Sequence, residues 1–212
     1  MTVFFMNMQK NITIAIQKDG RLSQHSIGYL AGRGICAQKN GRRLVSVCNA
    51  TNTRILWVRD DDIPHYVESG VADCGIVGTN VLAERGVSIP IISYLDFAYC
   101  KLVIAAPRAN RICSLSDLRG KKIATSYPRV LQKTLKENNI RADIIYFRGS
   151  VEIAPELGLS DAICDLSQTG ATLREHNMTP FHTILESQAV LIGTYTIPHN
   201  TVSRPLSTKH VL

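Results

Sequence analysis

The segment richest in chemically useful groups runs from Asp161 to Leu173 and reads DAICDLSQTGATL. Asp165 stands where an apolar, strand-like run ends, and a Thr-Gly-Ala-Thr sequence from Thr169 to Thr172 follows, where a helix can begin. The first backbone N–H groups of a helix lack intrahelical acceptors and attract anions, and a glycine lets a phosphate approach closely. Because a carboxylate can also bind a sugar diol, the segment predicts a sugar-phosphate site. A threonine-capped turn of any α/β protein is the alternative.

Basic side chains follow other predicted strands. Lys18 and Arg21 come after the first apolar run, and Arg59 comes after a later one. Residues that follow parallel strands gather at the ligand-binding edge of a sheet. Arginine also binds pyrophosphate-like groups through paired hydrogen bonds. Their positions therefore make Lys18 and Arg21 candidates for facing a ligand at that edge, with solvated surface charges as the alternative explanation.

The remaining polar candidates each have a structural explanation beside a functional one. Asp62 fits a helix cap before a proline, and Asp73 fits a turn before a buried strand. Glu152 fits either a helix cap or a ribose contact. Gly78 fits either a tight turn or the close approach of a ligand.

Composition narrows the class of ligand. The 212-residue chain has a net charge of +7, which fits either a basic surface or a cleft that attracts a polyanion. Long Lys/Arg blocks and basic–aromatic stripes are missing, which favours a small phosphorylated ligand over a nucleic acid. The six cysteines and six histidines have no metal-ligand spacing, so we expect no protein-held metal and no disulfide framework. Scattered cysteines and the lack of a long apolar segment indicate a cytoplasmic protein without a membrane span.

The elements that must position these residues alternate between strands and helices, which predicts an α/β fold with largely parallel sheets. Predicted strands cover residues 12–16, 44–47, 55–58, 74–77, 101–105, 122–125, 144–147, 162–166 and 189–192. Predicted helices cover residues 23–34, 62–70, 128–138 and 152–157, and one more begins near 169. We expect one lobe over residues 1–95 and a second over 96–183, with 184–200 returning to the first lobe. Residues 194–212 should form a surface tail, of which 201–212 belongs to neither lobe.

The Asp161–Leu173 segment resembles the loop that binds phosphoribosyl pyrophosphate (PRPP) in phosphoribosyltransferases, and it is most similar to that of ATP phosphoribosyltransferase. Other segments match this family in the same order along the chain. They are residues 14–22 (IAIQKDGRL), 58–64 (VRDDDIP) with 70–78 (GVADCGIVG), 122–128 (KIATSYP) and 149–155 (GSVEIAP). The resemblance covers residues 12–192.

This resemblance implies a two-lobed α/β fold like that of type II periplasmic binding proteins, with a cleft between the lobes. It implies that Asp165, Thr169, Gly170, Ala171 and Thr172 bind the ribose and 5′-phosphate of PRPP. Arg59 would stabilise the departing pyrophosphate. The ATP and pyrophosphate side would comprise Lys18, Gly20, Arg21, Asp62, Asp73, Gly78 and Glu152.

The implied reaction is attack of N1 of ATP on C1 of the ribose, the first step of histidine biosynthesis. It needs positioning and electrostatic stabilisation rather than a protein nucleophile. Mg²⁺ would be carried mainly by the substrates' phosphates. The length is typical of the family's short form, although several motifs look closer to the long form. A homo-oligomer and a regulatory subunit resembling histidyl-tRNA synthetase are therefore expected, unless a C-terminal regulatory domain has been lost.

Two other classes of function share this fold, because fold alone does not determine function. A two-lobed solute or effector receptor would bind without chemistry, but it has no reason to possess the Asp165–Thr172 loop. A degenerate homologue with a regulatory role would not need intact cleft motifs. Nucleic-acid binding is a more distant alternative.

Overall fold

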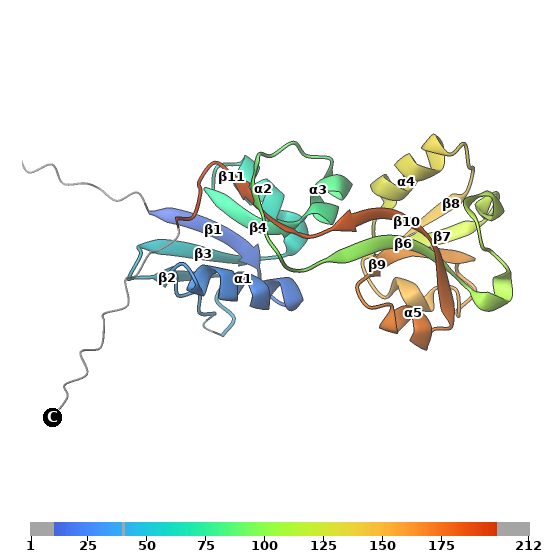
Figure 1. Ribbon diagram of the computed structural model, residues 1–212, viewed down its shortest axis with the longest axis horizontal. Helices are drawn as coiled ribbons and strands as arrows, with labels where there is room; N and C mark the ends of the chain where they lie inside the picture. Colours follow the sequence, from blue (N-terminus) through green and yellow to red (C-terminus); the bar gives the residue numbers. More distant parts are fainter. Residues whose placement is uncertain (1–10, 40, 199–212) are drawn as a thin grey trace, which may run out of the picture.

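The structure, a computed structural model, describes residues 11–39 and 41–198. It consists of two α/β lobes that lie side by side along the long axis of the molecule (Figure 1). Within the described residues, no helix has the length and hydropathy that crossing a membrane requires.

Lobe I is built on a mixed six-stranded sheet with the order β2-β3-β1-β4-β11-β5. Its centre is parallel, because β1 pairs in parallel with both β3 and β4. The strands are β1 (Ile12–Gln17), β2 (Val45–Cys48), β3 (Thr53–Val58), β4 (Cys74–Gly78), β5 (Ile91–Tyr94) and β11 (Ala189–Gly193). The helices are α1 (Arg21–Ala31), α2 (Ile63–Glu68), α3 (Thr79–Arg85) and a 3-10 turn at Asp60–Asp62.

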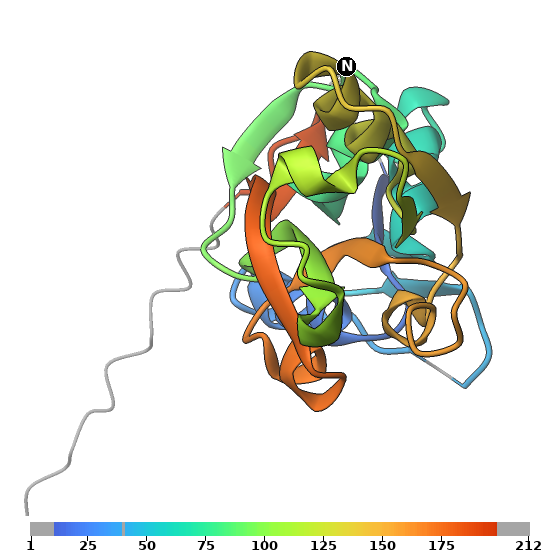
Figure 2. The same cartoon turned by 90° about the vertical axis from the view of Figure 1, so that its right-hand side faces the viewer.

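Lobe II is built on a five-stranded sheet with the order β10-β6-β9-β7-β8. Its strands are β6 (Cys100–Pro107), β7 (Lys122–Thr125), β8 (Asp143–Tyr146), β9 (Ala162–Ser167) and β10 (Met178–Ser187). Its helices are α4 (Pro128–Glu137) and α5 (Ala171–Glu175), with 3-10 turns at Arg108–Asn110, Leu115–Leu118 and Val151–Ile153. The two α-helices cover opposite faces of this sheet (Figure 2).

Each lobe has its own apolar core on both faces of its sheet. In β1, Ile14 and Ile16 pack on one face while Ala15 packs on the other. In β6, Leu102 packs under α4 and Val103 packs under α5. Alternate residues of a strand point to opposite faces, so a strand covered on both sides is a continuous apolar run. This explains why these strands could be located from the sequence.

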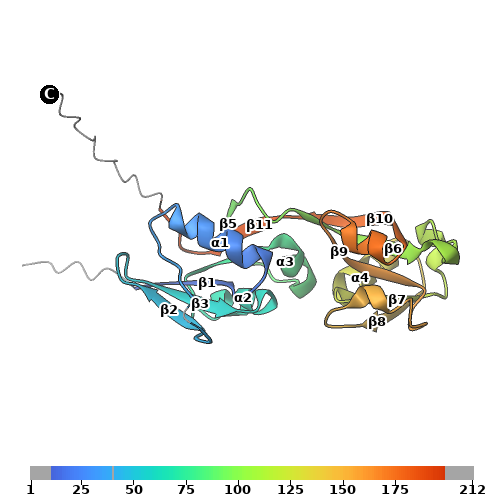
Figure 3. The same cartoon turned by 90° about the horizontal axis from the view of Figure 1, so that it is seen from below.

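The chain crosses between the lobes twice, after β5 and before β11. The two crossing segments run next to each other on one side of the molecule (Figures 1 and 3), where Ala189 and Phe97 are joined by a backbone hydrogen bond of 3.1 Å. The return was expected at residue 184, but β10 pairs with β6 as far as Ser187 opposite Cys100. The crossing therefore falls at Gln188.

The sequence-based assignment of elements needs several corrections. The helix expected over residues 152–157 is only a 3-10 turn at Val151–Ile153. β5, α3 and β10 were not predicted; β10 contains Pro180 and two register irregularities, which interrupt its alternating pattern. The prediction of a surface tail from residue 194 is also wrong at residue 197. Ile197 is only 3% exposed and packs in the core of lobe I. Residues 201–212 lie outside the described residues.

Candidate active site

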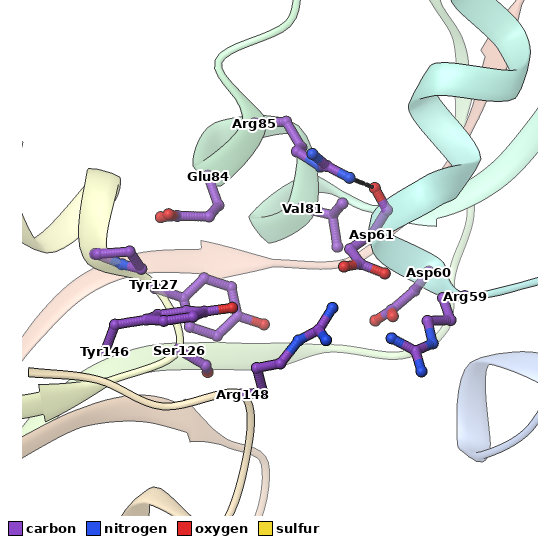
Figure 4. Close-up of a pocket in the computed structure, with 11 residues that line it drawn as sticks. Arg59, Asp60, Asp61, Val81, Glu84, Arg85, Ser126, Tyr127, Tyr146 and Arg148 are labelled. Carbon is purple, nitrogen blue, oxygen red and sulfur yellow. Dashed lines mark hydrogen bonds between the residues drawn. The ribbon is translucent and has the colours of Figure 1, made fainter.

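Two cavities lie between the lobes and share Asp60 and Val81. The arginine pocket has a volume of about 800 Å³ (Figure 4). It is lined by Arg59, Asp60, Asp61, Val81, Glu84, Arg85, Ser126, Tyr127, Pro128, Tyr146 and Arg148. The loop pocket has a volume of about 480 Å³ and lies against the segment from Ile163 to Leu173. Its lining from elsewhere includes Gln17, Arg21, His25, Gly78, Asn80, Tyr99 and Glu152.

The loop pocket is shaped by the connection from β9 to α5. Asp165 lies in the second half of β9, and Gly170 turns the chain into α5 with a left-handed backbone (φ 71°) that favours glycine. The carbonyl of Thr169 accepts a hydrogen bond of 3.0 Å from Arg174, which stabilises the turn. All five residues predicted to bind a sugar phosphate, including Ala171 and Thr172, line this one pocket.

Asp165 has the most perturbed carboxyl group of the loop pocket. Its half-buried position raises its pKa to about 6, and the nearby charge of Glu152 contributes to the rise. Hydrogen bonds from the backbone N–H of Leu166 and from the side chain of Ser126 act in the opposite direction. A carboxylate that is poorly hydrated but held by fixed donors is suited to accept hydrogen bonds from a sugar diol.

Lobe I contributes a basic group and a close-packed turn to the loop pocket. Arg21, at the start of α1, donates a hydrogen bond through Nη1 to Oε1 of Gln168 in the β9–α5 loop. Gly78 ends β4, and a Cβ atom there would overlap Oδ1 of Asn80. Gly78 has an ordinary backbone (φ −77°), so the lack of space rather than the backbone conformation favours glycine.

The arginine pocket combines cationic groups from both lobes with aromatic groups from lobe II. The guanidinium groups of Arg59 from lobe I and Arg148 from lobe II both point into the space between the lobes (Figure 4). Tyr127 and Tyr146 lie beside them on the lobe II side. Burial raises the pKa of Asp60, which is half-buried at the junction of the two pockets.

Separate hydrogen bonds hold Asp61 and Tyr127 in the lining of the arginine pocket. Arg85 donates to the carbonyl oxygen of Asp61 through Nε at 2.9 Å and Nη2 at 2.6 Å. Tyr127 accepts a hydrogen bond of 2.9 Å from Nδ2 of Asn80 in lobe I. Burial raises the pKa of Tyr127 above its ordinary range, so its hydroxyl stays neutral and adds no charge to the pocket.

Four of the predicted site residues, Lys18, Gly20, Asp62 and Asp73, lie outside the linings of both pockets. The carbonyl of Lys18 accepts a hydrogen bond from Lys39, and Gly20 precedes α1 with a φ of 94°. Asp62 precedes α2 without a capping hydrogen bond and lies 3.6 Å from Arg85.

Asp73 is the clearest correction. Its Oδ2 accepts a hydrogen bond of 2.9 Å from the backbone N–H of Thr13, which ties the start of β4 to β1. Asp73 precedes β4, whereas the cleft lies at the carboxyl end of that strand, where Gly78 is found. Asp73 lies five residues before Gly78, which is roughly 16 Å along a strand. This position is too far from the cleft for the substrate role predicted for Asp73.

Several cleft residues were missed by sequence reasoning. Ser126 and Tyr127 directly follow β7, and Arg148 comes two residues after β8. The rule that places Lys18, Arg21 and Arg59 after strands applies equally to these three residues, so a usable signal was present. The same signal applied to Asn80, which comes two residues after β4, whereas Glu84 had none because α3 was not predicted.

The described residues contain no group of three or more His, Cys, Asp or Glu side chains that could hold a metal ion. The acidic cluster at Asp60–Asp62 does not form such a site, since Asp62 pairs with Arg85 and lies outside the pockets that Asp60 lines. What the cleft offers is a set of cations, hydroxyls and amides that suit phosphate and sugar groups.

Comparisons with known proteins agree with this chemistry. A family model described as ATP phosphoribosyltransferase matches residues 59–207. The ATP phosphoribosyltransferase of Cytophaga hutchinsonii is 44% identical over 184 residues, which cover 87% of this chain and 64% of that protein. The chain thus spans slightly less than two thirds of the length of such curated relatives.

Solved structures support the fold. The ATP phosphoribosyl transferase (HisG:HisZ) complex from Thermotoga maritima matches with a TM-score of 0.75 and 31% identity, covering 86% of this chain and 87% of that one. The periplasmic aliphatic sulphonate binding protein of Escherichia coli has a TM-score of 0.55 at 15% identity, over 86% of this chain and 64% of that one. The second likeness concerns the fold alone, and together they confirm the predicted two-lobed architecture.

Proposed function

The chain belongs to the ATP phosphoribosyltransferase family, and on this premise we propose that it transfers the 5-phosphoribosyl group of PRPP to N1 of ATP. The products are phosphoribosyl-ATP and pyrophosphate, and the reaction is the first step of L-histidine biosynthesis. The observation that carries the proposal is the pair of adjoining pockets, one lined by the Asp165–Thr172 loop and the other by arginines. Two anionic substrates in these pockets would meet at their junction.

We assign PRPP to the loop pocket. Asp165 would accept hydrogen bonds from the ribose hydroxyls, and Thr169 and Thr172 would donate to the 5′-phosphate. Arg21 reaches this pocket from lobe I and already contacts the loop through Gln168. Its positive charge would favour the binding of an anion from the opposite wall of the cleft.

We assign ATP to the arginine pocket. The rings of Tyr127 and Tyr146 offer aromatic surface for the adenine base. Arg148 would neutralise part of the triphosphate, and Arg59 would face the pyrophosphate of PRPP. Mg²⁺ would enter as part of the substrates, bound to their phosphates, because it favours phosphate oxygens and water over a protein cage.

The chemistry then requires positioning more than a protein nucleophile. The lone pair of N1 forms a bond to C1 of the ribose while the bond from C1 to the pyrophosphate oxygen breaks, and its electrons leave with pyrophosphate. Positive charge develops on the ribose and negative charge on the leaving group. Fixed donors aimed at the developing anion lower the barrier, and we propose this role for Arg59.

The direct test is pyrophosphate release by the purified chain with Mg²⁺, PRPP and ATP, omitting each substrate in turn. Release that needs both substrates, with phosphoribosyl-ATP as a product, is the expected result. PRPP binding without turnover, even after a regulatory subunit is added, would favour a receptor. Absence of PRPP binding would contradict the assignment of the loop pocket.

We further propose that the chain works in the cytoplasm as a homo-oligomer with a regulatory subunit. The Thermotoga maritima neighbour was solved as a complex of two proteins, and it is of similar length to this chain. Purification with tagged chain as bait would test this proposal. A monomer without any stable partner would contradict it.

A further inference from the structure

A set of contacts joins α3 of lobe I to the start of α4 in lobe II, beside the arginine pocket. The two helices lie next to each other where the lobes meet (Figures 1 and 3). We call these contacts the lobe latch: Asn80, Glu84 and Gly86 on one side, and Tyr127, Arg129 and Val130 on the other. Asn80 and Glu84 are four residues apart, so they project from the same face of α3.

The start of α4 depends on lobe I for its cap. Tyr127 precedes the helix and makes no side-chain capping bond, and the first turn contains no acidic residue. Instead, Glu84 accepts hydrogen bonds from the backbone N–H groups of Arg129 at 2.9 Å and Val130 at 3.0 Å. These are the free N–H groups that a capping side chain normally binds, and a carboxylate there also interacts favourably with the helix dipole.

The reverse contact connects α4 to the end of α3. Gly86 ends α3 in a left-handed conformation (φ 63°), and a Cβ atom there would overlap the guanidinium group of Arg129. The guanidinium therefore lies directly against the carboxyl end of α3, where a positive charge is favourable. Each helix end receives a charge of the appropriate sign from the other lobe.

Asn80 extends the latch to the crossing segment. Its Oδ1 accepts a hydrogen bond of 2.8 Å from Ser187 at the end of β10, and its Nδ2 donates to Tyr127 at 2.9 Å. The backbone N–H of Tyr127 in turn donates to Thr125 in β7 at 2.9 Å. Because Asn80 is 5% exposed, both of its polar groups need these partners.

We propose that the lobe latch holds the cleft closed, with Glu84 as a positioning residue that places Ser126 and Tyr127 between the two substrate pockets. All of its contacts join groups of the chain itself, so they favour the closed arrangement independently of a ligand. Periplasmic binding proteins close around their ligands by hinge motion, whereas the latch would supply part of the free energy of closure before a ligand binds. The inference concerns the fold, and only its kinetic consequence rests on the proposed function.

The test compares Glu84→Gln with Glu137→Gln. Glutamine keeps the length of Glu84 but loses the charge and directs an NH2 group toward N–H donors. Glu137 lies at the other end of α4, is exposed and pairs only with Lys133 in the described structure, so its variant makes the same charge change away from lobe I. Arg129→Ala removes the opposite half of the latch.

We expect the KM for PRPP of Glu84→Gln to rise about tenfold, because an open population reduces apparent affinity by the closed fraction. PRPP is the informative substrate, since Glu84 does not line the loop pocket. Arg129→Ala should change KM in the same direction by a smaller factor, and Glu137→Gln should match the unmodified protein.

Small-angle X-ray scattering provides a second measurement of cleft closure, one that does not require the enzyme to turn over. The radius of gyration of Glu84→Gln should exceed that of Glu137→Gln, and circular dichroism should show the same helix content in both. Equal radii and equal KM values would overturn the latch. A fall in kcat at unchanged KM would also overturn it, because Glu84 would then act in the chemical step. If the unmodified chain showed no turnover, scattering alone would still decide.

Discussion

At the residue scale, Asp165 shows how a functional group conflicts with stability. Its half-buried carboxyl is poorly hydrated, and its pKa is raised to about 6 from an ordinary value of 3.8. Folding therefore favours the protonated form of a side chain whose ionised form would be the stronger acceptor in the proposed contact with a sugar diol. Such conflicts are typical of binding sites, where the ligand supplies the missing donors.

The Asp165→Asn variant should show in which direction the carboxyl group of Asp165 changes stability with pH. Because the pKa of Asp165 is raised in the folded state, its protonated form stabilises the fold. This contribution to the free energy of unfolding is fully present below about pH 4 and is lost as the pH rises through about 6. At pH 8 the variant should therefore be more stable than the unmodified protein by about 1–3 kcal/mol, and the gap should narrow toward pH 4. Thermal unfolding measured from pH 4 to pH 8 checks this. A difference that is independent of pH would contradict it, and PRPP binding should be weakened throughout.

Arg59 is the residue for which a catalytic role has been proposed. Arg59→Ala should lower kcat about 100-fold, because it removes a donor to the leaving pyrophosphate. Arg54→Ala is a matched control, since Arg54 is exposed on β3 and lies outside both pockets. Steady-state kinetics at saturating substrates distinguishes the two variants. Normal turnover of Arg59→Ala would refute the role.

At the element scale, the cleft is assembled from strand-to-helix connections. β4 leads through Gly78 into α3, β7 leads through Ser126 and Tyr127 into α4, and β9 leads through Gly170 into α5. Each connection lies at the carboxyl end of its strand, and each brings polar groups to the cleft. The turn at Gly78 leaves no room for a side chain, because the side chain of Asn80 folds back over it.

Gly78→Ala should therefore be destabilising although its backbone conformation is ordinary. The new Cβ would displace Asn80 from Ser187 and Tyr127, and we expect a loss of about 1–3 kcal/mol in the free energy of unfolding. Gly28→Ala is the control, because Gly28 lies in α1 with open space around the Cβ position. That change should be neutral or stabilising by about 0.5–1 kcal/mol. Chemical denaturation of both variants tests the contrast.

At the scale of the whole molecule, lobe I is completed by the part of the chain that returns from lobe II. β11 lies between β4 and β5, and Ile197 packs against the same core as Ile14 and Trp57. Lobe I therefore cannot form its full core from the first 95 residues. The two lobes are linked in stability as well as through the cleft.

Ile197→Ala should measure this dependence. Removing a side chain that is 3% exposed should cost about 2–4 kcal/mol in the free energy of unfolding. Leu157→Ala, at a residue that is 64% exposed, should change stability by less than about 0.5 kcal/mol. Equal effects in a denaturant titration would show that residues near 197 do not contribute to the core.

The sequence by itself determined the features that depend on local pattern. Continuous apolar runs located the central strands β1, β3, β4, β6, β7 and β9, since a strand covered on both faces has this composition. The order of the motifs indicated the family and the two lobes. Asp165, Arg21 and Arg59 were identified as candidates because their residue types and their positions near or after the ends of strands are local properties.

Only the tertiary structure decided which of these residues share a cavity and what holds the lobes together. Asp73 proved to lie at the far end of its strand, and α4 proved to be capped by Glu84 from the other lobe. Glu84 and Arg129 are 45 residues apart, and neither carries a local pattern that refers to the other. Periodicity encodes which face of an element is buried. Which element packs against that face depends on how the lobes pack against each other. The sequence pattern does not encode this, because the chain returns to lobe I only after it has formed lobe II.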